Sequence, residues 1–238
     1  MDKIIGLGNA LIDVLATLKD DTLLDELELP KGSMQLIDDA KLQQINTKFS
    51  QMKTHLATGG SAGNAILGLA CLGAGTGFIG KVGTDHYGDF FRKNLQKNNI
   101  EDNLLTSEQL PSGVASTFIS QDGERTFGTY LGAAASLKAE DLTLEMFKGY
   151  AYLFIEGYLV QDHEMILHAI ELAKEAGLQI CLDMASYNIV ENDLEFFSLL
   201  INKYVDIVFA NEEEAKAFTG EEPEEALRVM PRNAALLL

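Results

Sequence analysis

The stretch GGSAGNAILGLACLGAGTGFIGKVGTDHYG, residues 59–88, contains ten of the chain's 21 glycines. Ordered glycine loses more conformational entropy than any other residue, so this density indicates backbone that turns with positive φ or approaches another group closely. Apolar residues keep helical spacing over residues 61–72, and Gly73 follows where a left-handed residue ends a helix. The pair Gly59-Gly60 therefore precedes a helix start, where free backbone N–H groups can bind a polar or anionic ligand.

Two known phosphate-binding motifs fit part of this stretch, and both fail on their context. Gly75, Gly77 and Gly80 match the spacing of the dinucleotide fingerprint, but that motif follows a strand and opens a helix. Here a predicted helix precedes the glycines, and a predicted strand at residues 78–82 follows them. The Walker A alternative needs Ser or Thr where this chain has Val82. An NAD-dependent oxidoreductase is therefore only our third-ranked function.

The rest of the chain alternates strands with helices. An initial strand is predicted at residues 3–9 and a helix at residues 85–98. Further strands are predicted at residues 151–155, 178–182 and 205–209, and helices at residues 162–176 and 189–203. This order indicates an α/β fold whose mostly parallel sheet carries helices on both faces.

Residues 14–37 and 112–130 differ from the rest of the chain, because apolar and polar residues alternate there and turn signals are frequent. In the second segment Asp122-Gly123 joins two alternating runs, which predicts a hairpin. We expect the two segments to pair into one small sheet outside the main layer. Residues 38–52 between them predict an amphipathic helix that is capped by Asp38 or Asp39.

Composition excludes several classes of protein. Eighteen basic and 36 acidic residues give a net charge of −18, which opposes binding to nucleic acid or to an anionic membrane. No signal segment and no apolar run of membrane-spanning length is present, so we expect a soluble, cytoplasmic protein. Cys71 and Cys181 lie in apolar runs without CxxC spacing, which predicts two buried thiols in a reducing compartment.

Several motifs together carry a resemblance to a known family. They are Gly59-Gly60-Ser61-Ala62-Gly63-Asn64-Ala65, Gly80-x-Val82-Gly83-x-Asp85-x-x-Gly88, Gly6-x-Gly8-Asn9-x-x-x-Asp13 and Asn211-x-x-Glu214. The chain resembles the ribokinase/PfkB family of sugar and nucleoside kinases over nearly its whole length. The resemblance implies a ribokinase-like three-layer α/β fold with a small β lid, formed by residues 14–37 and 112–130, that commonly also provides a homodimer contact.

The resemblance also implies an activity and a substrate site. The activity is ATP-dependent phosphorylation of a hydroxymethyl group on a sugar or nucleoside. The implied substrate-binding residues are Asn9, Asp13, Gly59, Gly60 and Asn64. Asp13 follows a strand end, where its carboxylate suits a sugar diol because it accepts two hydrogen bonds, although an aspartate here is equally typical of a turn.

The side that binds ATP and Mg²⁺ is assigned to Asn211, Glu214 and Asp183, with Glu214 acting on the metal through water. The first two are also a helix cap and its capping-box partner, which needs no function. The match at Asp183 is weak. The sequence Tyr130-Leu131-Gly132-Ala133 is similar to that of adenosine-kinase-like members, so a nucleoside is a plausible substrate within the broader label of sugar kinase.

One family motif does not occur in the sequence. The motif Asp-Thr-x-Gly-Ala-Gly-Asp, which carries the family's catalytic Asp and anion hole, is absent from residues 1–238. Residues 234–238 look like the start of another strand, so we expect a C-terminally incomplete ribokinase-like domain whose general-base Asp lies beyond Leu238. A protein that naturally lacks the motif would instead be a non-catalytic sugar- or nucleoside-binding or regulatory module, and this alternative stays open.

Overall fold

The glycine-rich stretch forms the elements that its sequence predicts. It folds into helix α3 (Ser61–Cys71), strand β5 (Thr76–Gly83) and helix α4 (His86–Lys97). Gly73 takes a φ of +88° just after α3, as a left-handed terminating residue does. The Asp85 side chain caps α4 by accepting hydrogen bonds from backbone N–H groups of its first turn.

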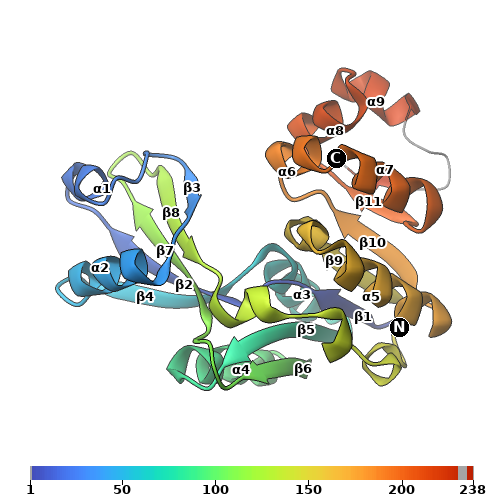
Figure 1. The fold of residues 1–238 in the computed structure, drawn as a ribbon, viewed down its shortest axis with the longest axis horizontal. Helices are drawn as coiled ribbons and strands as arrows, with labels where there is room; N and C mark the ends of the chain where they lie inside the picture. The colour runs from blue at the N-terminus through green and yellow to red at the C-terminus, as the bar shows by residue number, and fades with distance from the viewer. Residues whose placement is uncertain (1, 230–234, 238) are drawn as a thin grey trace.

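The structure of the protein is a computed structural model, which describes residues 2–229 and 235–237. Within these residues a seven-stranded sheet has the order β12-β11-β10-β9-β1-β5-β6, and every neighbouring pair is parallel (Figure 1). The bounds of the strands not yet given are β1 (Ile4–Leu7), β6 (Ile100–Ser107), β9 (Tyr152–Glu156), β10 (Gln179–Asp183), β11 (Ile207–Phe209) and β12 (Ala235–Leu237). This main sheet brings the carboxyl ends of its strands to one edge.

Helices cover both faces of the main sheet, which confirms the predicted fold class. Alternate side chains of β9 point to opposite faces. Leu153 and Ile155 pack in the core that includes helix α5 (His163–Glu175), while Phe154 belongs to the core that includes α3. Four 3₁₀ helices also occur in the described residues: η1 (Gly132–Ser136), η2 (Ala139–Asp141), η3 (Leu144–Phe147) and η4 (Gly157–Gln161).

A small sheet lies to one side of the main sheet (Figure 1). Its order is β3-β8-β7-β2-β4, with β2 (Leu11–Thr17), β3 (Met34–Leu36), β4 (Thr54–Gly59), β7 (Gly113–Ile119) and β8 (Arg125–Tyr130). The two predicted β segments do pair, because β2 runs parallel to β7 and β3 runs parallel to β8. Strand β4 was not predicted, since its sequence THLATG carries little apolar alternation.

Helix α2 (Asp39–Phe49) packs on one face of the small sheet and begins at the predicted cap Asp38. The Phe49 ring lies 5.0 Å from the ring of Phe118 on β7. A short helix, α1 (Thr22–Glu26), precedes β3. The hairpin between β7 and β8 turns at Gly123 with a φ of +87°, in agreement with the Asp122-Gly123 signal.

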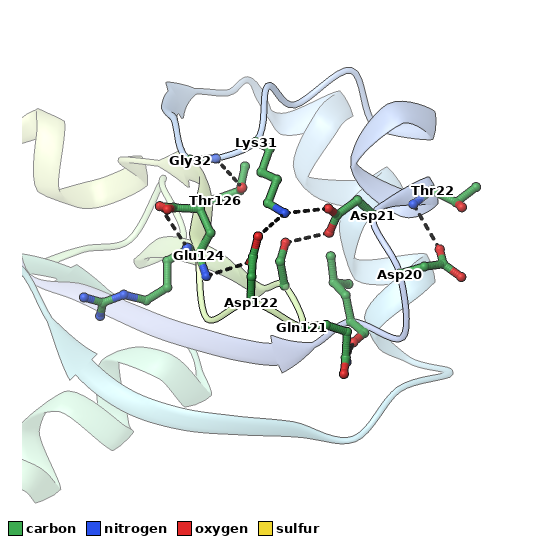
Figure 2. A network of polar contacts seen from close by, with 12 residues as sticks. Asp20, Asp21, Thr22, Lys31, Gly32, Gln121, Asp122, Glu124 and Thr126 are labelled. Atoms are coloured by element: carbon green, nitrogen blue, oxygen red, sulfur yellow. Dashed lines mark hydrogen bonds and ion pairs between the residues drawn. The ribbon is translucent and has the colours of Figure 1, made fainter.

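An ion-pair network ties the segment before β3 to this hairpin (Figure 2). The Lys31 amine lies 2.8 Å from the carboxylate of Asp21 and 2.6 Å from that of Asp122. The Ser120 hydroxyl donates to Asp21 at 2.6 Å, and the Gly32 N–H donates to the Thr126 hydroxyl at 2.9 Å. Strand β3, which has a single neighbour in the small sheet, is therefore anchored at its N-terminal end.

The structure corrects two sequence predictions. Residues 189–203 do not form one helix, because the chain breaks at Asp193 into α6 (Tyr187–Asn192) and α7 (Leu194–Lys203). Asp193 has φ −134° and ψ 36°, and its carbonyl starts the second helix. Cys71 is exposed rather than buried, because it lies at the end of α3 on the side that faces solvent, whereas Cys181 is buried as predicted.

The last part of the chain continues the alternation. Helix α8 (Glu212–Thr219) follows β11, and helix α9 (Pro223–Val229) precedes β12. Strand β12 confirms the centre of the strand predicted at residues 234–238, of which Ala234 and Leu238 lie outside the described residues. None of the helices in the described part of the chain is both long and apolar enough to cross a bilayer.

Candidate functional site

A cavity of about 580 Å³ lies between the carboxyl edge of the main sheet and the small sheet. Its polar floor contains Asn9, Gly60, Ser61 and Glu156, which come from the end of β1, the start of α3 and the end of β9. Its other lining residues include apolar Met34 and Leu36 of β3 and Met165 of α5, and also polar Lys138, Gln161 and Asp162. Sequence elements far apart in the chain therefore share one partly open cavity with a polar floor.

Glu156 organises the floor, and the sequence analysis missed it. Its Oε1 accepts a 2.7 Å hydrogen bond from Asn9 Nδ2 and a longer one of 3.4 Å from the Asn9 N–H. Its Oε2 accepts from the Ala62 N–H at 3.1 Å, in the first turn of α3. Burial of this carboxyl raises its pKa, and the three donors only partly offset that effect. The available signal was an acidic residue at the end of the buried strand Tyr152–Glu156.

The glycine pair allows the chain to pass close to this floor. Gly60 has a φ of +86°, and a Cβ there would lie 2.3 Å from the backbone oxygen of Asn9. A Cβ at Gly59 would lie 2.5 Å from Asp13 Oδ1. Both positions require glycine because the end of β4 and the start of α3 press against β1 and β2.

Asp13 lies on the face of the small sheet that is directed at the cavity. It pairs with Ala115, which pairs with Thr129, which in turn pairs with Leu36. Residues directly opposite each other in a sheet project from the same face, and Thr129 and Leu36 both line the cavity. Burial raises the pKa of Asp13, while the positive charge of Arg125 lowers it.

The five substrate residues proposed from the sequence do not all reach the cavity wall. Asn9 and Gly60 line it, whereas Asp13, Gly59 and Asn64 are not among the described residues that do. Asp13 and Gly59 touch each other directly beside Gly60. Asn64 is exposed on the first turn of α3, where its N–H bonds the Gly60 oxygen. The structure thus gathers four of the five around the glycine pair and leaves the Asn64 side chain at the surface.

Asp183 meets the floor at Ser61 and lies close to Glu214, but neither of these two residues lines the cavity. The Ser61 hydroxyl donates to Asp183 Oδ2 at 3.1 Å, and burial raises the pKa of Asp183. Burial also raises the pKa of Glu214, and the negative charge of Asp183 adds to the effect. The carboxyl group at the end of β10 and the one in the first turn of α8 are thus close enough to influence each other.

The Asn211 and Glu214 pair forms the helix cap that the sequence allows. The Glu214 N–H donates to Asn211 Oδ1 at 2.8 Å, while both Glu214 oxygens accept from Asn211, at 2.8 Å from its N–H and at 2.9 Å from Nδ2. No group of three or more His, Cys, Asp or Glu side chains among the described residues is arranged to hold a metal ion. Because the cap already uses both oxygens, Glu214 fits an indirect contact with Mg²⁺ through water better than direct coordination, and Mg²⁺ commonly retains several waters.

The second half of the glycine-rich stretch, which contains Gly83, Asp85 and Gly88, lies away from the cavity. Asp85 Oδ1 accepts from the Tyr87 and Gly88 N–H groups and from the Ser112 hydroxyl, and Asp85 Oδ2 accepts from the Ser112 N–H at 2.7 Å. The Ser112 hydroxyl oxygen accepts from the Gly83 N–H at 2.9 Å. These bonds fix the residues through which the chain passes from β6 into β7 of the small sheet. None of these five residues lines the cavity.

Comparison with known proteins gives a consistent assignment. The sequence profile described as "pfkB family carbohydrate kinase" matches residues 32–235. Guanosine-inosine kinase of Escherichia coli (strain K12) is 25% identical over 230 residues, which cover 92% of this chain and 53% of that protein. Adenosine kinase 2 of Arabidopsis thaliana is 25% identical over 227 residues, which cover 91% of this chain and 64% of that protein. The chain thus spans about half the length of the first of these relatives and less than two thirds of the second.

Solved structures show the same fold. The adenosine kinase from Sinorhizobium meliloti has a TM-score of 0.84 and 30% identity, and the match covers 100% of this chain and 74% of that one. A probable sugar kinase protein from Rhizobium etli CFN 42 has a TM-score of 0.85 and 29% identity, with the same coverage of both chains. The match to a mostly parallel, ribokinase-like architecture confirms the fold class predicted from the sequence.

Proposed function

Because the chain belongs to the pfkB family of carbohydrate kinases, we propose that its protein transfers the terminal phosphoryl group of ATP to a hydroxymethyl group of a nucleoside or sugar. The observation that carries the proposal is the cavity at the carboxyl edge of the parallel sheet, where ligands of such folds bind. Its polar floor suits the hydroxyl groups of a sugar ring. We propose that the protein is cytoplasmic, because the cytoplasm supplies ATP for this reaction.

A nucleoside fits this cavity better than a free sugar. A single sugar ring needs hydrogen bonds on most of its edges, and the side formed by Met34, Leu36 and Met165 offers none from side-chain donors. A nucleoside has a polar ribose, which suits the floor, and a flat base whose faces can pack against the side formed by Met34, Leu36 and Met165. The names of the relatives, guanosine-inosine kinase and adenosine kinase, support a purine nucleoside.

We assign the ribose to the floor. Asn9 and Asp13 would hydrogen-bond ribose hydroxyls, with the Asp13 carboxylate accepting two hydrogen bonds from a diol. The backbone at Gly59 and Gly60 would approach the sugar closely, because neither residue has a Cβ. Asn64 would take part only if its exposed side chain turned toward the ligand. Glu156 would hold Asn9 and the start of α3 in place.

The ATP side is assigned to Asp183, Asn211 and Glu214. Mg²⁺ bound with ATP would neutralise negative charge on the phosphoryl group that is transferred. Glu214 would orient a water of the metal from its fixed position in the helix cap. We also propose that the small sheet acts as a lid over the substrate, with Met34 and Leu36 of β3 facing the cavity, and that it provides a homodimer contact.

The rival function is a non-catalytic nucleoside- or sugar-binding module of the same fold. The observation in its favour is the absence of the Asp-Thr-x-Gly-Ala-Gly-Asp motif from residues 1–238. A downstream Gly-Ala-Gly-Asp in the complete gene would support the kinase over this alternative.

One experiment separates these functions. The full-length protein is titrated with adenosine, inosine, ribose and fructose in a calorimeter, and ADP release is measured with Mg-ATP. We expect nucleosides to bind and to be phosphorylated. Binding without ADP release would favour the binding module, tight binding of ribose or fructose alone would make it a sugar kinase, and no binding of any of the four would refute both functions.

A further inference from the structure

His163 occupies a defined position in the cavity wall that none of the assigned roles explains. It is the first residue of α5 and lines the cavity together with Leu159 and Met165. Its side chain remains 51% exposed. Gln161 and Asp162, which directly precede it, also line the cavity. The position of the imidazole ring in this wall needs a reason, either structural or functional.

Two contacts hold the His163 ring. Its Nε2 lies 2.7 Å from Asp193 Oδ2, and its ring stacks on that of Phe196 with centroids 3.7 Å apart and planes 14° apart. Phe196 is itself buried at the start of α7. The carboxylate of Asp193 is available to His163 because the chain breaks between α6 and α7 at that residue. The ring is therefore oriented by both an in-plane hydrogen bond and a face contact.

This arrangement leaves one part of the imidazole unused. A carboxylate only accepts hydrogen bonds, so Nε2 is the donor, and in the neutral ring Nδ1 keeps an acceptor lone pair. Phe196 covers one ring face, and the opposite face has no ring partner among the described residues. An exposed His–Asp pair adds little to stability, so holding the fold together is a weak explanation for the arrangement.

The surroundings select the chemical class of ligand. Met34 and Leu36 of β3, Met165 of α5 and Ile189 of α6 line the cavity, together with the polar residues Lys138, Gln161 and Asp162. A planar heteroaromatic ring with N–H groups can either stack on the open imidazole face or donate a hydrogen bond to Nδ1 in the ring plane. A free sugar has no aromatic face that could stack on the imidazole. The ligand group that fits is a purine base with an N–H edge.

We propose that His163, oriented by Asp193 and Phe196, contacts the base of a purine nucleoside and makes the site prefer nucleosides over free sugars. This inference rests on the proposed function, since the ribose must occupy the floor for the base to reach this wall. His163 acts as a specificity-determining residue, and Asp193 acts through it as a positioning residue.

The chain offers a matched control. His86 is also the first residue of a helix, α4, and its ring also contacts an aromatic neighbour, with its centroid 3.9 Å from that of Tyr87 and the ring planes tilted by 37°. It does not line the cavity. Replacing either histidine removes a helix-start imidazole and one ring contact, but only His163 is expected to affect ligand binding.

The test measures the affinity of the full-length protein for adenosine, inosine and ribose by calorimetry. We expect H163A to lower nucleoside affinity about three- to tenfold while ribose affinity stays unchanged. H86A should leave all three affinities unchanged. H163F keeps a stacking ring without Nδ1, so it should recover part of the nucleoside affinity, and D193N should fall between wild type and H163A.

Several outcomes would overturn the inference. Equal nucleoside affinity for wild type and a folded H163A would show that His163 does not contact the base. An equal loss of affinity for nucleosides and for ribose would show the same. If circular dichroism shows that H163A does not fold, H163F and D193N decide the test. Nucleoside affinities equal to those of the wild type in both variants would count against the proposal. Failure of the wild type to bind any nucleoside or sugar would refute the proposed function itself and this inference with it.

Discussion

Gly60 and Gly83 lie in the same glycine-rich stretch, and a side chain at either position would collide with backbone. At Gly60 the added Cβ would lie 2.3 Å from the oxygen of Asn9, beside the floor of the cavity. At Gly83 it would lie 2.7 Å from both the Leu110 oxygen and the Ser112 nitrogen, where the chain enters the small sheet. One sequence feature thus serves close backbone packing at two separate places.

The carboxyl groups at the two places behave in opposite ways. Burial raises the pKa of Glu156, which lies at the cavity floor against the first half. Burial alone would also raise the pKa of Asp85 in the second half, but hydrogen bonds from Gly88, Ser112 and Tyr87 outweigh it and lower the pKa. A glycine-rich backbone therefore does not by itself mark a ligand site. The first half faces a cavity, while the second half forms a joint whose polar groups are satisfied internally.

The largest expected effect tests whether the first half of the stretch brings catalysis as well as binding. The 238-residue chain expressed alone should show no measurable phosphotransferase activity with ribose, fructose, adenosine or inosine. Lack of a general base costs about 10² to 10⁴ in rate, and lack of an anion hole costs about 10² to 10³ more. ADP release with Mg-ATP is the measurement. Clear activity would mean that a base has been overlooked, with Asp183 beside Ser61 as the first candidate.

Gly60→Val tests the role of the first half in binding. The substitution forces a branched side chain into a φ of +86° and against the Asn9 oxygen, so substrate binding should fall below detection in calorimetry. Strain and overpacking should also lower the free energy of unfolding by about 2 to 5 kcal/mol.

Gly73→Ala is the control for strain alone, because Gly73 has a φ of +88° but no atom within 4 Å of its added Cβ. It should lose about 1 kcal/mol of stability and keep its affinity for substrate. Normal binding by a folded Gly60→Val variant would remove the distinction between the two halves.

The opposite pKa shifts give a smaller, pH-dependent difference. Asp85 has a lowered pKa, so its stabilising contribution is present above its unfolded pKa of about 3.9 and is lost as pH falls through the folded value. Glu156 has a raised pKa, so its contribution is present below about pH 4.3 and is lost as pH rises through the folded value.

Urea unfolding of wild type, Asp85→Asn and Glu156→Gln between about pH 2.5 and about pH 8 measures this difference, because this range extends well below the unfolded pKa of an aspartate. The loss caused by Asp85→Asn should be greater at neutral than at acidic pH. The loss caused by Glu156→Gln should be greater at acidic than at neutral pH. Parallel pH profiles for the two variants would show that the two halves do not differ electrostatically.

The smallest expected effect concerns the reactivity of the Cys71 thiol, which lies in the first half of the stretch. Cys71 is exposed at the end of α3, whereas burial raises the pKa of Cys181 to about 11. A thiol reagent at neutral pH should therefore label one cysteine of the native chain quickly, and the second only after denaturation. Cys71→Ser should abolish the fast phase. Fast labelling of both thiols would mean that the core around β10 opens readily.

Much of the fold followed from local sequence. The caps at Asp85 and Asn211, the turn at Gly123 and the left-handed Gly73 were predictable because each depends on residues within a few positions along the chain. Of the substrate residues proposed from the sequence, Asn9 and Gly60 line the cavity. The roles of all five stay predictions, as do the domain boundaries and the Mg²⁺ side.

By itself, the sequence determined most strands and helices of the main sheet, although not β6, as well as the pairing of the two β segments and the place of the glycine pair at a helix start. Only the tertiary structure decided that Glu156 meets Asn9 across 147 residues, that Asp193 interrupts a helix and meets His163, and that Cys71 faces solvent. The physical reason is the separation along the chain between the residues that interact. Caps and turns are satisfied by neighbouring residues, whereas burial and the pairing of distant polar groups exist only after the sheets have assembled.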